Sequence, residues 1–384
     1  MALKESPHPE RDRGLRPGEQ SKDAPPLSSN GRGRRRSASY ERFDEALDRL
    51  AGYGPELANG NFNHAPMVAE ALCALGRPEA VMPWIERYRS RMLPLPVAGE
   101  PIRAADWRSV LGRRGCFADW HLFFAGALRE APWRAVLDLW AGRLAPGVSA
   151  AATHGAIRTG HAVRGLAASE SPQRLAELAG ALASWASSYQ ELPGAAAAAN
   201  GALAPREAIA RVAIVPPERR RPGNITAALA RLEDFPEFAP AIGLANLDGD
   251  IGERVAELTE LFARVFLANA HNVLTAIVFV HGVTSLAALE HIAPQVSAAA
   301  AQPLLRYGWQ AGCGLYACFG GETAVAAEIA PAANDPEALI DRALANGHEH
   351  VIKFTEACLA RHAMAPSPAF PAAAARVLAL IGHR

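Results

Sequence analysis

The sequence predicts an all-α fold, a large multi-helix single domain that follows a disordered basic N-terminal tail. Apolar residues recur at helical spacing through most of the chain from residue 41 onward, and alternating strand patterns are nearly absent. Alanine, which favours helix more than any other residue, is abundant. Half of the 384 residues are hydrophobic, which is enough to bury a large core.

The N-terminal tail comprises residues 1–40. It is rich in Arg, Pro, Ser and Gly, poor in large apolar residues, and ends in the basic run Gly31–Ser37. Such a run can bind nucleic acid or carry a targeting signal, but it is more often a solvated tail. Because the chain has a formal net charge of zero and only the tail is basic, we expect no nucleic-acid partner.

The helical domain, residues 41–384, starts with an amphipathic helix at Tyr40–Leu50. Asn63–Pro66 predicts the next helix start, with a cap-type residue followed by proline in the first turn, and Gly76 predicts its end. Further helices are expected at 78–92, 104–113, 117–129, 132–143, 148–168 and 173–189.

A stretch rich in Pro, Gly and Ala, residues 190–224, separates two halves of similar size. It is either a boundary between two lobes or a long loop. We favour a single domain, because the candidate site residues come from both halves. The second half is expected to contain helices at 224–233, 236–246, 250–269, 270–291, 301–318, 321–330, 335–361 and 370–382.

Cysteine usage and hydropathy indicate the compartment. The five cysteines form no CxxC pair, which argues against a zinc ribbon or a thioredoxin-like site, and an odd number fits a reducing cytoplasm. No apolar segment of a secretory signal is visible. The most apolar run, Val273–Val280, is too short to span a bilayer. We therefore expect a cytoplasmic protein with no membrane partner.

Four histidines, His64, His154, His281 and His350, stand in apolar helical segments far apart in the sequence. A single histidine on an apolar face is usually a hydrogen-bonded core residue. Four of them on four helices are a different matter, because helix bundles build metal sites by converging side chains from facing helices. Imidazole binds Fe, Zn, Cu and Ni, so the ligand type does not identify the metal.

Lys353 follows His350 by three residues, so both side chains can point at one spot from one helix face. A buried ammonium would repel a cation, and burying it without a partner costs free energy. The pair is therefore consistent with a metal site only if the lysine is neutral or chemically converted. The alternative is an unmodified Lys353 paired with Glu349 or Glu356.

Two further residues near His154 are candidates for work on a substrate. His161 lies about 10 Å further along the same helix face, too far to share one metal with His154. If His154 is a ligand, His161 lines the cavity or acts on the substrate. Arg158, one turn from each, could orient an anionic substrate group or form a salt bridge across helices.

Four segments carry these residues: Asn63–Met67 with Glu70–Leu72 and Leu75–Gly76, then Thr153–Arg158, Phe279–Thr284 and His350–Phe354. In this order the chain resembles the questin oxidase-like family. The resemblance extends from about residue 45 to 361, which is most of the chain apart from the tail. Each motif alone is weak, but four in order, each with its histidine, are fairly specific.

The resemblance implies an all-helical oxygenase that opens anthraquinone rings, a Baeyer–Villiger-type outcome, in aromatic polyketide synthesis. It also implies a non-haem Fe(II) held by His64, His154, His281, His350 and a carbamate on Lys353. Burial and a nearby cation would favour the neutral amine that a carbamate needs. His161 falls where fungal members more often have tyrosine, so their substrate is not carried over with it.

Three functions remain open at this point. The first is a metal-dependent oxygenase that uses O₂ on a polycyclic phenol or quinone in secondary metabolism, with His161 taking the phenolic proton. The second is a zinc-dependent hydrolase or lyase on the same site. The third is a non-enzymatic all-α binding protein whose histidines are core residues. The aromatic residues expected to line a flat pocket, or else to pack in the core, are Trp185, Phe279, Trp309 and Tyr316.

Nucleotide-binding motifs are missing. Gly312–Gly314 follows no predicted strand and its third glycine is out of place for the dinucleotide fingerprint, and there is no P-loop and no GxSxG elbow. The sequence thus contains no motif for a flavin or NADPH. An oxygenase of this kind would take its electrons from the substrate or from an outside donor. Nothing in the sequence indicates an oligomeric state.

Overall fold

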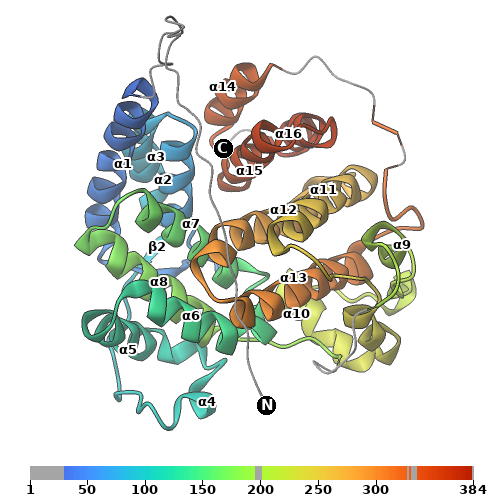
Figure 1. Cartoon of the computed structure of the whole chain (residues 1–384), viewed down its shortest axis with the longest axis horizontal. Helices are drawn as coiled ribbons and strands as arrows, with labels where there is room; N and C mark the ends of the chain where they lie inside the picture. Colours follow the sequence, from blue (N-terminus) through green and yellow to red (C-terminus); the bar gives the residue numbers. More distant parts are fainter. Residues whose placement is uncertain (1–29, 195–200, 327, 330–334, 383–384) are drawn as a thin grey trace, which may run out of the picture.

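A computed structural model of the chain describes residues 30–194, 201–326, 328–329 and 335–382, with the backbone alone for 30–39 (Figure 1). The described part is mainly helical, so the all-α prediction is confirmed. The α-helices are α1 (Asn30–Leu50), α2 (Ala65–Ala74), α3 (Val81–Tyr88), α4 (Trp107–Val110), α5 (Phe117–Glu130), α6 (Trp133–Leu144), α7 (His154–Ala168), α8 (Pro172–Ser187), α9 (Pro205–Ile209), α10 (Ile225–Ala230), α11 (Ile251–Asn269), α12 (Val273–Ile292), α13 (Ala298–Phe319), α14 (Pro336–Asn346), α15 (Glu349–Met364) and α16 (Ala369–Leu380).

Short elements connect these helices. The 3₁₀ turns are η1 (Pro78–Ala80), η2 (Arg89–Arg91), η3 (Arg114–Cys116), η4 (Ala145–Gly147), η5 (Pro217–Arg219), η6 (Arg231–Asp234), η7 (Pro236–Gly243) and η8 (Ala293–Gln295). Two antiparallel strands, β1 (Tyr53–Leu57) and β2 (Met92–Pro94), form a small sheet that the sequence did not predict.

Helix α12 is the central element of the fold. It packs against α11, α13, α7 and α15, and Figure 1 shows α11, α12 and α13 crossing the middle of the molecule. Its start is fixed by a capping box between Asn272 and Thr275. Val273–Gln295 is, within the described residues, the one helix long and apolar enough to cross a membrane, but 72% of its apolar window is buried inside the protein. Such burial is typical of a core helix.

Helix α7 lies unusually close to its neighbours because glycines face them. A Cβ on Gly155 would lie 2.7 Å from the Cα of Trp185 in α8, and one on Gly160 would lie 2.5 Å from the Cβ of Ala288 in α12. The small residues seen in this segment therefore allow close helix packing. This packing brings the start of α7 next to α12.

The two halves on either side of 190–224 share one hydrophobic core. A single cluster of buried side chains runs from Trp107 to Ile381 in the sequence. A second, smaller cluster joins α1, α2 and α3, with Ile352 of α15 packed against it. Trp185, Phe279, Trp309 and Tyr316 all belong to the larger cluster, which agrees with the core alternative for these aromatic residues.

Several predicted boundaries were wrong. The helix expected over 148–168 begins only at His154, because residues 151–153 adopt positive φ angles. The helix expected over 335–361 is two helices, since Gly347 has φ +72° and ends α14. The described residues of 321–329 are not helical, 104–113 contains only the short α4, and 236–246 is largely the 3₁₀ segment η7.

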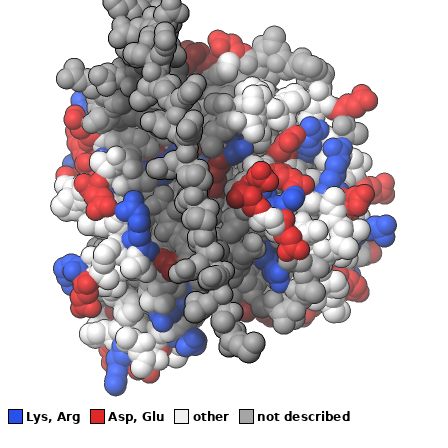
Figure 2. All heavy atoms as spheres, viewed as in Figure 1, with Lys and Arg blue, Asp and Glu red and all other residues white. Residues whose placement is uncertain are grey.

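The predicted tail lies mostly outside the described residues. Residues 1–29 are not among them, and α1 begins at Asn30, inside the range assigned to the tail. On the face seen in Figure 2, the described Lys and Arg side chains are interspersed with Asp and Glu.

The close packing of α7 predicts how two glycine substitutions differ. Gly160→Ala should lower the free energy of unfolding by about 1–3 kcal/mol, because its Cβ would collide with the backbone of α12. The control is Gly142→Ala in α6, whose Cβ would meet Ala300 at an ordinary 3.8 Å. It should be neutral or stabilising by up to about 1 kcal/mol. Denaturant unfolding measures both, and equal effects would contradict the packing argument.

Candidate metal centre

The four predicted histidines meet at one place, although each comes from a different element. His64 is the residue before α2, His154 is the first residue of α7, His281 lies in the middle of α12 and His350 lies in the first turn of α15. Each is at most 8% exposed. The sequence separations between neighbours in the cluster reach 286 residues, from His64 to His350. Only the tertiary fold brings them together.

The distances within this cluster are short. The Nε2 atom of His154 lies 3.1 Å from Nε2 of His64 and 3.3 Å from Nε2 of His281. The ring centroid of His350 lies 4.6 Å from that of His64 and 5.2 Å from that of His281. Nitrogen atoms of His64, His154 and His350 lie within 4.8 Å of one another, which suits a shared metal ion.

Local contacts hold each histidine in place. The Asn63 side chain accepts a hydrogen bond from Ala65 N at 3.0 Å and donates one to Gly54 O at 2.9 Å, while His64 N donates to the Tyr88 hydroxyl at 3.1 Å. At the other end of the chain, His350 N donates to Nδ1 of His348, the N-cap residue of α15. The backbone of both histidines is thus fixed before any ligand binds.

The tautomers of two histidines follow from their partners. His154 Nδ1 lies 2.5 Å from the carbonyl oxygen of Ala151, and His281 Nδ1 lies 2.6 Å from that of Ile277. A carbonyl oxygen only accepts, so each Nδ1 carries the proton and each Nε2 presents a lone pair. These two lone pairs face each other across 3.3 Å with no proton between them. A cation between the nitrogens would turn this repulsion into binding.

Three other ring nitrogens of the cluster lack a hydrogen-bond partner among the described residues. They are both ring nitrogens of His350 and Nδ1 of His64. Buried polar atoms left in this way cost free energy. Nitrogens about 2.0–2.1 Å from one ion are about 2.8–3.4 Å apart when the angle between them at the ion lies between 90° and the tetrahedral value. The two measured Nε2 separations fall in that range, so these residues fit a metal ion.

The electrostatics keep the imidazoles in the form that binds metals. Burial, together with the Lys353 charge and the neighbouring histidines, lowers the pKa of His64 and of His350 well below the ordinary value. Burial and the charges of His281 and Lys353 do the same to the pKa of His154. For His281, burial and Lys353 lower the pKa to about 4. All four rings are therefore neutral near pH 7.

A strained turn precedes His154. Ala151, Ala152 and Thr153 have φ angles of 47°, 57° and 70°, in the left-handed region that alanine and threonine rarely adopt. Such residues persist where the surrounding structure holds them, often at functional sites. Here the turn aims the Ala151 carbonyl at Nδ1 of His154, and so orients the ring.

Lys353 is 2% exposed and lies within electrostatic reach of all four histidines. Its Nζ lies 3.7 Å from the sulfur of Met67, and burial lowers its pKa to about 7, against the opposing effect of Glu349. Glu356 is bound to Arg164 instead, and Glu349 lies 3.5 Å from Arg91. The amine thus sits in a place that favours its neutral form.

A cavity of about 530 Å³ opens onto the histidine cluster, and all four rings line it. This volume lies within the range of about 300–1,000 Å³ that is typical of small-molecule binding pockets. Phe62 forms part of the wall, with its ring stacked on that of His154 at a centroid distance of 4.8 Å. The other wall residues include the apolar Pro94, Pro96, Ile225, Leu274 and Ile277 and the polar Ser184, Ser187, Ser188, Asn224, Thr226 and Glu349.

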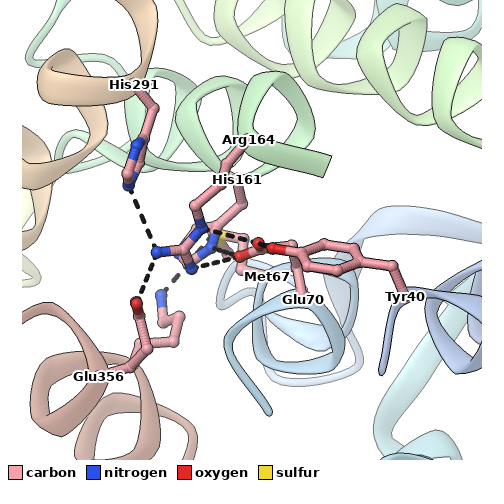
Figure 3. Close-up of polar contacts among 8 residues, drawn as sticks. Tyr40, Met67, Glu70, His161, Arg164, His291 and Glu356 are labelled. Carbon is pink, nitrogen blue, oxygen red and sulfur yellow. Dashed lines mark hydrogen bonds and ion pairs between the residues drawn. The ribbon is translucent and has the colours of Figure 1, made fainter. Parts of the chain in front are cut away.

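His161 does not line this cavity, which corrects the expectation that it meets the substrate. Its Nδ1 lies 2.7 Å from Glu70, and its side chain borders a separate pocket of about 20 Å³ (Figure 3). Two helical turns place His161 about 10 Å beyond His154 along α7. The cavity is lined instead by Ala151 and Ala152, which precede His154.

Arg158 is also absent from the residues that line the cavity. Its guanidinium binds both carboxylate oxygens of Glu177 at 2.7 Å and donates to Ser184 at 3.0 Å. The salt bridge across helices, which the sequence left open, is what the structure contains. Phe62 and the strained turn were not anticipated. Phe62 could have been found from its position two residues before His64, but nothing in Ala151–Thr153 indicates a left-handed turn.

A family model described as questin oxidase-like matches residues 62–358, a range that contains all five candidate ligands. The chain belongs to the questin oxidase-like family. A search of curated proteins found no match. The family suggests an oxygenase-type function in secondary metabolism, and the resemblance inferred from the four histidine segments is confirmed.

The neutral cluster predicts a stability that depends on pH in metal-free protein. Folded-state pKa values lie below the unfolded value of 6.5, so the unfolded chain binds more protons and stability falls as the pH drops from 7 toward 4. For His281, a fall of the pKa from 6.5 to about 4 corresponds to about 3 kcal/mol in total, of which about 2 kcal/mol is lost between pH 7 and pH 5. Denaturant unfolding at pH 7 and pH 5 with a chelator measures the change.

The attribution to the cluster is checked with His281→Leu, which should lose part of the pH dependence. If the wild-type protein unfolds with the same free energy at both pH values, the imidazoles are not buried in neutral form as described.

Proposed function

We propose that this protein is a metal-dependent oxygenase that oxidises a polycyclic phenol or quinone with O₂ in secondary metabolism. The observation that carries the proposal is the pair of Nε2 lone pairs on His154 and His281, which face each other at the floor of a cavity of about 530 Å³. Membership of the questin oxidase-like family supports an oxidoreductase.

His64, His154, His281 and His350 would hold the ion, and we propose Fe(II) as its identity. Bound iron would supply the activation of O₂, which side chains alone do not provide. Four neutral imidazoles leave the charge of a divalent ion uncompensated. An anionic fifth ligand would lower that charge.

We propose Lys353 as that fifth ligand, in the form of a carbamate. Its neutral amine would attack CO₂, form the N–C bond and release one proton to water. The support is burial, a pKa lowered to about 7, and a position three residues from His350 on the same helix. The amine's contact with the Met67 sulfur is weak compared with an ion pair, so little is lost on conversion.

The cavity walls would bind and orient the substrate. Phe62 and the apolar residues around it offer flat surface for an aromatic ring system and exclude water from the metal-facing end. The hydroxyl oxygens of Ser187 and Ser188, whose protons go to the Ser184 carbonyl, can accept a hydrogen bond from a phenol hydroxyl. His161 is not among the residues that line the cavity, so the proposal gives it no role in taking the phenolic proton.

The compartment and the electron donor are proposed from the sequence. We propose a cytoplasmic enzyme, on the odd number of cysteines, and electrons drawn from a hydroquinone substrate or an external donor such as NADPH, for which no binding motif was found. A small aromatic substrate and O₂ are the partners that the cavity supports.

Metal content is the first test. Protein purified under anaerobic conditions and loaded with Fe(II) should hold about one iron per chain, measured by elemental analysis. His281→Ala should lose the metal and keep its helical circular dichroism. His271→Ala is the control, because His271 is exposed at the start of the same helix and should leave metal content unchanged.

Other outcomes assign other functions. Stoichiometric zinc with no uptake of iron would favour a hydrolase or lyase. If neither the wild-type protein nor the control variant binds any metal, the cluster is a core feature and the proposal fails.

The carbamate predicts that bicarbonate matters for metal binding. Removal of CO₂ and bicarbonate should weaken Fe(II) binding by the wild-type protein, because the fifth ligand is lost. Lys353→Met should bind Fe(II) with the same weak affinity whether or not bicarbonate is present. Calorimetric titration measures both, and a bicarbonate effect that persists in Lys353→Met would contradict the role of the lysine.

A further inference from the structure

A largely buried polar layer lies further along the helices that carry the histidine cluster, and none of its members lines the cavity. We call it the inner polar layer, and Figure 3 shows its members around one guanidinium. They are Tyr40, Glu70, His161, Arg164, His291 and Glu356.

Arg164 is the centre of this layer. Its Nε donates to Glu70 Oε1 at 2.7 Å and its Nη2 to Glu70 Oε2 at 2.5 Å. Its Nη1 donates to Glu356 at 2.5 Å and lies 3.3 Å from Nε2 of His291. Glu70 in turn accepts hydrogen bonds from the Tyr40 hydroxyl at 2.6 Å and from His161 Nδ1 at 2.7 Å.

The elements that meet here are the ones that carry the metal-site histidines. Glu70 is on α2, which His64 precedes; Arg164 is on α7, which His154 begins. The same holds on the other two helices, where His291 follows His281 on α12 and Glu356 follows His350 on α15. One side chain, Arg164, therefore contacts all three of the other ligand-bearing elements.

The charges in the inner polar layer make it sensitive to the loss of Arg164. Burial alone would raise the pKa of Glu70, but Arg164 and the hydrogen bonds from His161 and Arg164 hold it well below its usual range. Glu70 is 0% exposed, so its carboxylate has no water to replace a lost partner. Removing the guanidinium would leave two buried carboxylates facing each other, and the helices that carry them would move apart.

We propose that Arg164 is a positioning residue for the metal centre: it fixes α2, α7, α12 and α15 at the spacing that makes the four imidazoles converge. The proposal rests on the proposed metal-dependent function. It assigns Arg164 no contact with the metal or the substrate. The proposed role differs from general stabilisation of the fold, because it predicts that a change in the inner polar layer alters the distances within the histidine cluster.

The chain contains a matched control on the same helix. Arg158 is 8% exposed, and like Arg164 it binds both oxygens of one glutamate, Glu177. Its partners Glu177 and Ser184 are both on α8, which carries none of the four histidines. Arg158→Met and Arg164→Met thus each remove a bidentate arginine–glutamate pair, but only the Arg164 pair connects ligand-bearing elements.

The experiment is a Co²⁺ titration of metal-free full-length protein, followed by the visible absorption of the bound ion. Arg164→Met is expected to bind Co²⁺ about 10- to 100-fold more weakly than wild type, with an altered absorption spectrum, because the ligand spacing changes. Arg158→Met should keep the wild-type affinity and spectrum, even if it unfolds more easily in denaturant. Circular dichroism confirms that each variant is folded.

A milder variant covers the case in which Arg164→Met does not fold. Glu70→Gln keeps the shape of the side chain and removes its charge, and it should also weaken Co²⁺ binding and alter the spectrum. The proposal would be overturned if Glu70→Gln, and Arg164→Met where it folds, bind Co²⁺ with wild-type affinity. It would also be overturned if Arg158→Met weakens Co²⁺ binding as much as Arg164→Met does. No Co²⁺ binding by the wild-type protein would overturn the metal-dependent function and this inference together.

Discussion

The central constraint in this structure is the close contact between two imidazole lone pairs, on Nε2 of His154 and Nε2 of His281. The Nδ1–H groups of His154 and His281 each donate a hydrogen bond to a backbone carbonyl, so the Nε2 atoms that face each other at 3.3 Å are both acceptors. Burial lowers the pKa values of both imidazoles, so near pH 7 neither Nε2 atom is protonated and no proton bridges the two. Protein atoms alone leave this contact unfavourable, and a cation makes it favourable. The fold holds the two rings there nonetheless.

Other features of the fold make sense as ways of holding that contact. Three residues in the left-handed region, 151–153, aim a carbonyl at His154, and the glycines of α7 let α8 and α12 approach until their backbones nearly touch. Strain and glycine both cost stability, so their gathering beside the cluster points to a site that must keep its geometry. The large cavity borders the cluster, and the inner polar layer lies further along the helices that carry the cluster. A ligand can therefore reach the cluster from the cavity.

The sequence predicted part of this arrangement. The helical fold and the four histidines were predictable, because each histidine sits in an apolar helical segment and its motif resembles one family. The position of His161 outside the cavity was not predictable, because helical spacing gives its distance from His154 along the axis but not the side on which the cavity opens. Arg158 was ambiguous because its partner Glu177 lies on another helix. Gly347 could have divided the helix at 335–361, whereas no residue type signals the turn before His154.

The most direct test of the account is a crystal structure of the Fe(II)-loaded protein, with anomalous data collected at the iron edge. We expect one anomalous peak bonded to nitrogens of His64, His154, His281 and His350 at about 2.0–2.2 Å, with density beyond the Lys353 amine. A structure in which these rings turn to separate water molecules or protein partners, with no peak between them, would contradict it.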